Sequence, residues 1–198
     1  MTEELIGLFD THAHPTDERF NEDREQVLAR MRGAGMLCMC VGADMASSAQ
    51  SVALANENEN IYAAVGVHPH DAKDFTEADI PQLTCWLTQE KKVKALGEIG
   101  LDYHYEDACP RETQKHWMER QLALAVELDL PVIIHDREAH EDTLRLLADK
   151  RPAGVVHCFS GSVEMMREVV RLGMYVGLGG VVTFKNARRP VEVAAAVP

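Results

Sequence analysis

The stretch VKALGEIGLDYH at residues 93–104 places a carboxylate, Glu98, in the middle of a short apolar run of the kind that forms a buried strand. An isolated ionised carboxylate is costly to bury unless it is paired or binds a metal ion. The stretch therefore indicates both a strand of the core and a charged group that the core must neutralise.

Six further apolar runs occur along the chain, and segments with helical periodicity lie between them. The seven runs cover residues 8–14, 36–42, 61–69, 93–102, 131–137, 153–161 and 174–180. Apolar residues three and four positions apart predict helices within 20–33, 46–58, 110–129, 139–150 and 162–172. Strands that are buried on both faces and separated by helices indicate parallel βα units.

Two architectures are built from repeated βα units. A doubly wound sheet that binds a dinucleotide has a glycine-rich loop after its first strand, whereas here that strand ends in THAHP, residues 11–15, without glycine. We therefore predict an α/β fold of the TIM-type (β/α)8 barrel class, as a single domain over residues 1–198. Such a barrel has eight strands, and the seventh unit runs into EVAAAVP, residues 192–198. We expect the barrel to be truncated after strand seven and most of helix seven.

The composition disfavours several classes of protein. Lys and Arg number 20 against 32 Asp and Glu, and the net charge of −12 opposes nonspecific binding to duplex DNA or to anionic membranes. The chain has neither an apolar run long enough to cross a bilayer nor the pattern of a signal peptide near its N-terminus. Five scattered cysteines without a CxxC pair fit reduced thiols, so we expect a cytoplasmic protein.

Histidines and one glutamate stand near the ends of successive strands, where TIM barrels build their active sites. His12 and His14 are two residues apart, so both side chains point to the same side of the first strand. Runs three to six carry, in order, His68, Glu98, His135 and His157. Closure of the barrel brings these side chains together, and imidazole with carboxylate suits zinc, manganese, iron or magnesium.

Six blocks of the sequence resemble the successive strand motifs of the TatD family of metal-dependent hydrolases. They are FDTHAH (9–14), GVHPH (66–70), ALGEIGLDYH (95–104), PVIIHDREA (131–139), VVHCFSGS (155–162) and YVGLGGVVTFKNA (175–187). The resemblance keeps the order of every block and runs from about residue 8 onward. It implies an amidohydrolase-like metal barrel that hydrolyses phosphodiester bonds, as a deoxyribonuclease of the 3′-to-5′ exonuclease type acting on DNA ends.

The resemblance also implies two divalent metal ions, either Mg, Mn or Zn. Their ligands by position are His12, His14 and Glu98 for one ion, and Glu98, His135 and His157 for the other. Glu98 is then the bridging ligand. In the family, an aspartate on the eighth strand completes the first site and activates water, and no residue of this sequence corresponds to it. We therefore expect weak or absent turnover from this chain.

Other polar residues near the strand ends are expected to support the reaction. We expect Asp102 and Asp136 to orient the metal ligands. Three side chains are expected to contact the substrate phosphate: His68, Arg137 and Lys185. The acidic surface favours single-stranded ends or short oligonucleotides over long duplex, whose binding depends on many phosphate contacts.

Two alternative functions stay open from the sequence. The same barrel supports hydrolysis of amides or lactones, although relatives with that chemistry often use a carboxylated lysine where this chain has Glu98. The chain could also be a non-catalytic fragment or binding protein, which the retained histidines oppose. The sequence defines neither the native metal nor the oligomeric state.

Overall fold

The computed structural model describes residues 7–105 and 109–198, and its seven parallel strands follow one another in chain order across a single sheet. The strands are β1 (Phe9–Ala13), β2 (Leu37–Val41), β3 (Ile61–Val65), β4 (Val93–Asp102), β5 (Val132–Arg137), β6 (Gly154–Val156) and β7 (Tyr175–Val176). The helices are α1 (Arg24–Gly33), α2 (Met45–Glu57), α3 (Ile80–Gln89), α4 (Arg111–Glu127), α5 (His140–Lys150), α6 (Val163–Arg171) and α7 (Arg188–Ala196). Two short 3-10 helices, η1 (Glu18–Phe20) and η2 (Gly180–Thr183), follow β1 and β7.

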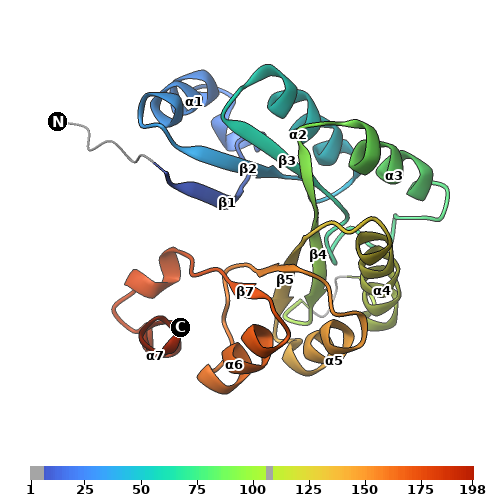
Figure 1. Cartoon of the computed structure of the whole chain (residues 1–198), viewed down its shortest axis with the longest axis vertical. Coiled ribbons are helices and arrows are strands. Elements are labelled where there is room, and N and C mark those ends of the chain that lie inside the picture. The colour runs from blue at the N-terminus through green and yellow to red at the C-terminus, as the bar shows by residue number, and fades with distance from the viewer. Residues whose placement is uncertain (1–6, 106–108) are drawn as a thin grey trace.

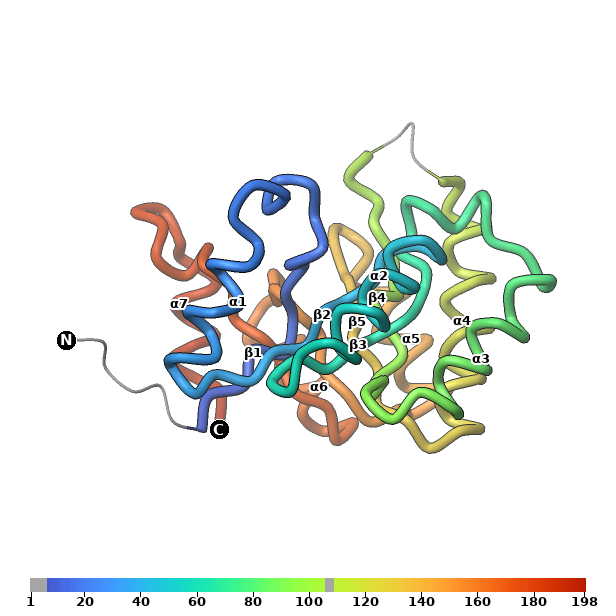
Figure 2. Tube along the Cα trace, turned by 90° about the horizontal axis from the view of Figure 1, so that it is seen from above, coloured from blue at the N-terminus to red at the C-terminus, as the bar shows by residue number. Residues whose placement is uncertain are grey.

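The sheet curves into an arc with helices along its outer side (Figure 1), which confirms the predicted TIM-type α/β fold. Viewed from above, α3 and α4 lie on the side of the molecule away from α1 and α7 (Figure 2). Within the described ranges, β1 pairs with β2 alone and β7 with β6 alone, so the arc is open between β1 and β7. Residues 1–6, which belong to the N-terminal stretch without a signal-peptide pattern, lie outside the described residues.

No helix in ranges 7–105 and 109–198 combines the length and the apolar character that crossing a membrane requires.

Apolar side chains pack on both faces of the sheet. On the outer face, leucines of the helices pack against the strands; the fully buried ones include Leu28, Leu83, Leu122 and Leu147. The inner face carries a smaller cluster of Met39, Val41, Ala64, Ala95 and Ile133. Because side chains alternate along a strand, the residue two positions after Ile133, His135, also faces inward. The inner cluster therefore forms an apolar floor, with the polar residues above it at the carboxyl ends of the strands.

The last two strands are shorter than the sequence predicts. The apolar run at 153–161 forms a strand only over Gly154–Val156, and the run at 174–180 only over Tyr175–Val176. The backbone N–H of His157 still donates to the Ile134 carbonyl at 3.0 Å, but Cys158 adopts a left-handed conformation with φ 42°. The regular strand therefore ends at Val156, and His157 follows directly at its carboxyl end.

Two glycines allow β4 and β5 to approach closely around Glu98. A Cβ atom on Gly100, whose φ is 151°, would lie 1.9 Å from the carbonyl oxygen of His135. A Cβ atom on Gly97 would lie 2.7 Å from the Cβ atom of Ile133. The pairing of β4 with β5 also shifts register between residues 96 and 99. Irregular pairing of this kind turns a side chain away from its regular direction, and here it accompanies the placement of Glu98.

Candidate metal centre

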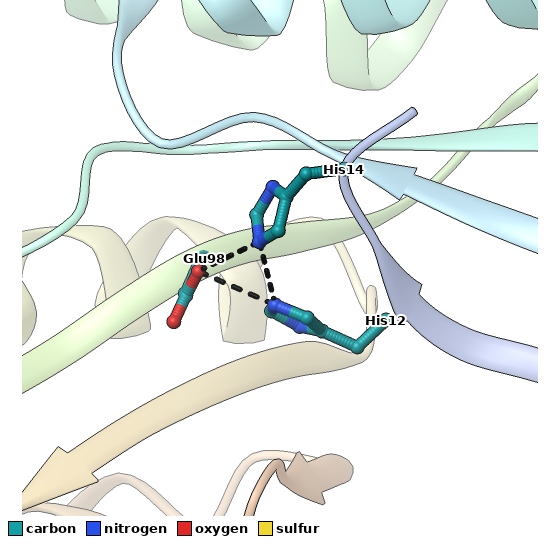
Figure 3. Close-up of side chains that lie close together, drawn as sticks. All are labelled: His12, His14 and Glu98. Carbon is teal, nitrogen blue, oxygen red and sulfur yellow. Dashed lines mark hydrogen bonds and ion pairs between the residues drawn. The ribbon is translucent and has the colours of Figure 1, made fainter. Parts of the chain in front are cut away.

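The carboxylate of Glu98 is buried at the carboxyl ends of the strands, and the residue is only 4% exposed. Its Oε2 atom lies 3.4 Å from His12 Nε2 and 3.7 Å from His14 Nε2, and Figure 3 shows both rings pointing toward it. The Nδ1 atom of His14 is 2.9 Å from the carbonyl oxygen of Val41. A carbonyl can only accept, so Nδ1 carries the proton of the neutral ring and Nε2 presents its lone pair. Metal-binding histidines are commonly oriented by such a bond.

The other oxygen of Glu98 faces a second set of histidines. Oε1 lies 2.6 Å from His157 Nε2, 2.9 Å from His135 Nδ1 and 3.7 Å from His68 Nε2. These residues come from the ends of β6, β5 and β3, three strands that are well separated in the sequence. One carboxylate thus lies between two groups of imidazoles, with one oxygen directed at each group.

Asp102, at the end of β4, lies behind the ring of His135. Its Oδ2 atom is 3.3 Å from His135 Nε2 and 2.9 Å from His70 Nε2, and the backbone N–H of His104 donates to Oδ1 at 2.9 Å. The residue is 1% exposed. The carboxylate therefore lies within hydrogen-bonding distance of the His135 ring, and its role in orienting that ring stays a prediction.

Asp136 is not brought to this centre. Its carboxylate accepts from His140 Nδ1 at 2.6 Å and from Thr143 Oγ1 at 3.1 Å, and both partners lie on α5 outside the sheet. Neighbouring residues of a strand face opposite sides, so Asp136 points away from the face to which His135 points. The structure thus gives Asp136 a role in attaching α5 to β5.

The surroundings of Glu98 determine its charge. Burial alone would raise the pKa of the carboxyl, but hydrogen bonds with three neighbouring histidines hold it well below its ordinary value. Burial lowers the pKa of His68 to about 3. Burial would also lower the pKa of His157, but the neighbouring Cys158 and Glu98 raise it to about 9. At neutral pH the metal-free centre therefore contains an ionised carboxylate, a neutral His68 imidazole and a protonated His157, and a metal ion would displace the proton of His157 on binding.

The donor atoms fit a divalent cation. The groups His12–His14–Glu98 and His68–Glu98–His135 each offer three ligand atoms within 4.8 Å of one another. In the part of the chain described, the Nδ1 atoms of His12 and His157 are buried without a hydrogen-bond partner. Nitrogen with carboxylate oxygen suits zinc or manganese. We predict from the sequence that His68 contacts the substrate. Its Nε2 atom lies 3.7 Å from Glu98 Oε1, so this histidine is also placed to bind an ion.

The cationic residues expected at the phosphate are not among the groups that surround Glu98. The Arg137 guanidinium is 5.0 Å from the centre of the Tyr105 ring, and its Nη1 donates to the Tyr105 hydroxyl at 3.3 Å. Lys185 follows η2 and is exposed. Neither residue contacts Glu98 in the way that the histidines do.

Two buried glutamines of α4 form hydrogen bonds with the backbone of residues next to the centre, and our predictions from the sequence did not include them. Gln114 accepts from the backbone N–H of Asp102 at 2.8 Å and donates to its carbonyl at 3.0 Å. Gln121 makes the same pair of bonds with Val67, next to His68, at 2.8 and 3.1 Å. Their spacing of seven residues places both on one helix face, which is the signal that could have revealed them.

A family model and similar proteins of known sequence indicate the same family for this chain. The family model described as TatD related DNase matches residues 9–198. The uncharacterized metal-dependent hydrolase YabD of Bacillus subtilis is 42% identical over 195 residues, which cover 96% of this chain and 76% of that protein. The 3′-5′ ssDNA/RNA exonuclease TatD of Cronobacter sakazakii is 38% identical, with 96% of this chain and 73% of the exonuclease covered.

Solved structures agree with the sequence comparison. YJJV, a TatD homologue from Escherichia coli K12, superposes with a TM-score of 0.89 at 35% identity, covering 96% of this chain and 75% of that chain. A hydrolase of the TatD family from Entamoeba histolytica has the same fold, with a TM-score of 0.85 at 24% identity, covering 100% and 71%. The chain therefore belongs to the TatD-related DNase family of metal-dependent hydrolases.

Proposed function

We propose that this protein hydrolyses phosphodiester bonds in single-stranded nucleic acid, removing nucleotides from the 3′ end. The observation that carries the proposal is the position of Glu98, which directs one oxygen toward His12 and His14 and the other toward His135 and His157. A carboxylate placed in this way can bridge two cations. The exonuclease from Cronobacter sakazakii, with 38% identity, supports the choice of reaction.

Each residue of the centre has a defined part in this proposal. His12 and His14 would hold one ion with Glu98, and His135 and His157 would hold the other. Such ions, when bound, acidify a water molecule and neutralise charge that develops on the phosphate. Asp102 fixes the ring of a ligand from behind, in the way that carboxylates orient histidines at other metal sites.

Two cationic residues, one at the end of β5 and one after β7, are proposed to contact the substrate. Arg137 and Lys185 supply positive charge near the phosphate, and His68 stands close enough to contact either an ion or the substrate. A guanidinium binds phosphate oxygens in pairs, which positions the bond to be cleaved. We also propose a cytoplasmic location, because the five cysteines are all unpaired thiols.

A labelled oligonucleotide tests the reaction directly. A single-stranded decamer labelled at its 5′ end is incubated with excess protein and Mn²⁺, Mg²⁺ or Zn²⁺, so that even a slow first turnover is visible. We expect products that shorten progressively from the 3′ end. Glu98→Gln should lower the rate by more than about 100-fold. Substitution of a residue that only orients a metal ligand already lowers activity by about 10- to 100-fold, and Glu98 is proposed as a ligand itself.

The control carries the same substitution on the surface. Glu127→Gln, at the exposed end of α4, should leave the rate unchanged. A panel of cyclic amides and lactones is assayed in parallel. Turnover of that panel, with no cleavage of the oligonucleotide under any of the three metals, would show that the phosphodiester proposal is wrong.

A further inference from the structure

An exposed aromatic side chain stands beside the metal centre without a part in the proposed chemistry. Tyr105 follows β4 and is 51% exposed. Its ring lies 5.4 Å from that of His70, with the planes at 77°, and the Arg137 guanidinium lies 5.0 Å from its centre. The arginine also donates to the tyrosine hydroxyl. The ring is therefore held in place while much of its surface stays open to solvent.

Short contacts connect this ring to the centre. His70 Nε2 is 2.9 Å from Asp102 Oδ2, and the same oxygen is 3.3 Å from His135 Nε2. The rings of His70 and His135 have their centres 6.5 Å apart. A single imidazole thus separates Tyr105 from a side chain that we propose as a metal ligand, so a group bound at the ring would be a close neighbour of a phosphate at the centre.

The geometry points to Tyr105 as a stacking surface for a nucleobase next to the bond that is cleaved. This inference rests on the proposed function and adds a binding residue to it. A base offers a flat apolar face, and stacking on an aromatic side chain is a principal source of affinity in proteins that bind single strands. Arg137 fixes the ring by its cation–π contact and supplies positive charge for the adjoining phosphate.

Stacking at Tyr105 has a consequence for the choice of substrate. Every base has an aromatic face, so the contact tolerates any sequence. In a duplex the base faces are already covered by their neighbours, and a base must be unstacked before it can reach the tyrosine. Tyr105 therefore selects for single strands by a route that is independent of the acidic net charge.

Measurements on two substrates distinguish an effect on the binding of a base from an effect on the reaction. One is single-stranded oligothymidylate, and the other is the abasic strand, the same chain whose last two residues keep their phosphodiesters but lack a nucleobase. Tyr105→Leu removes the aromatic ring, whereas Tyr105→Phe keeps it. Tyr62→Leu is the matched control, because Lys92 Nζ lies 4.4 Å over the Tyr62 ring but Tyr62 sits near the start of β3, at the other end of the strand from the centre.

We expect Tyr105→Leu to raise KM for the oligonucleotide by about five- to 150-fold, which corresponds to the usual cost of losing one stacked base. Its kcat, and KM for the abasic strand, should change by less than about twofold, because the reacting atoms are untouched and no terminal base is present to stack. Tyr105→Phe and Tyr62→Leu should resemble the wild type. An unchanged KM for the oligonucleotide in Tyr105→Leu, or an equal rise for both substrates, would overturn the inference.

Fluorescence distinguishes failure of this inference from failure of the proposed function. An oligothymidylate with 2-aminopurine at its last or second-last position is titrated with protein in EDTA, where no cleavage occurs. Stacking on Tyr105 should quench the fluorophore in the wild type and not in Tyr105→Leu. Quenching without any cleavage in metal would refute the proposed reaction alone. Cleavage with the same fluorescence in both proteins would refute the stacking alone.

Discussion

Substitution of the buried Gln121 tests whether its side-chain hydrogen bonds stabilise the segment that carries His68. The residue is 1% exposed, and it accepts from the N–H of Val67 while donating to the carbonyls of Val67 and Trp117, at 3.1 and 3.2 Å. Val67 immediately precedes His68 and lies beyond the end of β3. The side chain thus supplies hydrogen-bond partners to the N–H and the carbonyl of Val67, a residue that lies past the paired part of β3.

Replacing Gln121 by methionine keeps the length of the side chain but removes all three hydrogen bonds. The N–H and carbonyl of Val67 are then buried without these partners, and each such group costs about 1–3 kcal/mol. The Trp117 carbonyl lies within α4 and can still accept from the helix backbone, so its loss adds little. We expect Gln121→Met to lower the free energy of unfolding by about 2–6 kcal/mol, a large part of the 5–15 kcal/mol typical of a domain.

Urea unfolding followed by circular dichroism measures this loss. The slope of the transition should stay constant while its midpoint falls. Gln82→Met, at an exposed position of α3, is the matched control and should change stability by less than about 0.5 kcal/mol. A loss below about 1 kcal/mol in Gln121→Met would refute the reasoning, because it would mean that other groups satisfy Val67.

Two more predictions concern the aspartates that flank the centre. Asp102→Asn should weaken zinc binding by about 10- to 100-fold in a competition titration, because it disturbs the bond to His135, whereas Asp136→Asn should leave the affinity nearly unchanged. Equal effects on affinity would contradict the assignment of only Asp102 to the centre. The Asp136 hydrogen bond raises the pKa of His140 above its ordinary value of 6.5, so the pair stabilises the fold below about pH 6.5 and loses this effect as the pH rises through the raised pKa. His140→Gln should therefore cost about 1 kcal/mol near pH 6 and less near pH 9 in urea unfolding, and a cost that is independent of pH would count against this pair.

The alternation of apolar strands and amphipathic helices was sufficient to predict the fold and the order of the strands. It also placed His12, His14, Glu98 and the histidines of β5 and β6 on one edge, because parallel strands share the edge at which they end. The same alternation, applied to β5, puts Asp136 on the opposite face from His135. Our expectation that Asp136 supports the metal ligands overlooked this consequence of the strand geometry.

Other features depend on contacts that no local pattern records. A buried glutamine such as Gln114 looks like any polar residue of a helix until the strand end that it completes is known. The early end of β6 follows from the left-handed conformation of Cys158, which is uncommon for a residue other than glycine. The position of Tyr105 beside His70 depends on how β3 and β4 are joined to the segments that follow them.

The number of metal ions that the chain binds directly tests whether Glu98 bridges two ions. Equilibrium dialysis against Mn²⁺ or Zn²⁺ is carried out on the wild type, on Glu98→Ala and on the surface control Glu127→Ala. A bridging Glu98 predicts about two ions per chain for the wild type and the control, and fewer than about one for Glu98→Ala. One ion or none in the wild type, or two ions retained by Glu98→Ala, would contradict the central claim that this carboxylate joins two metal sites.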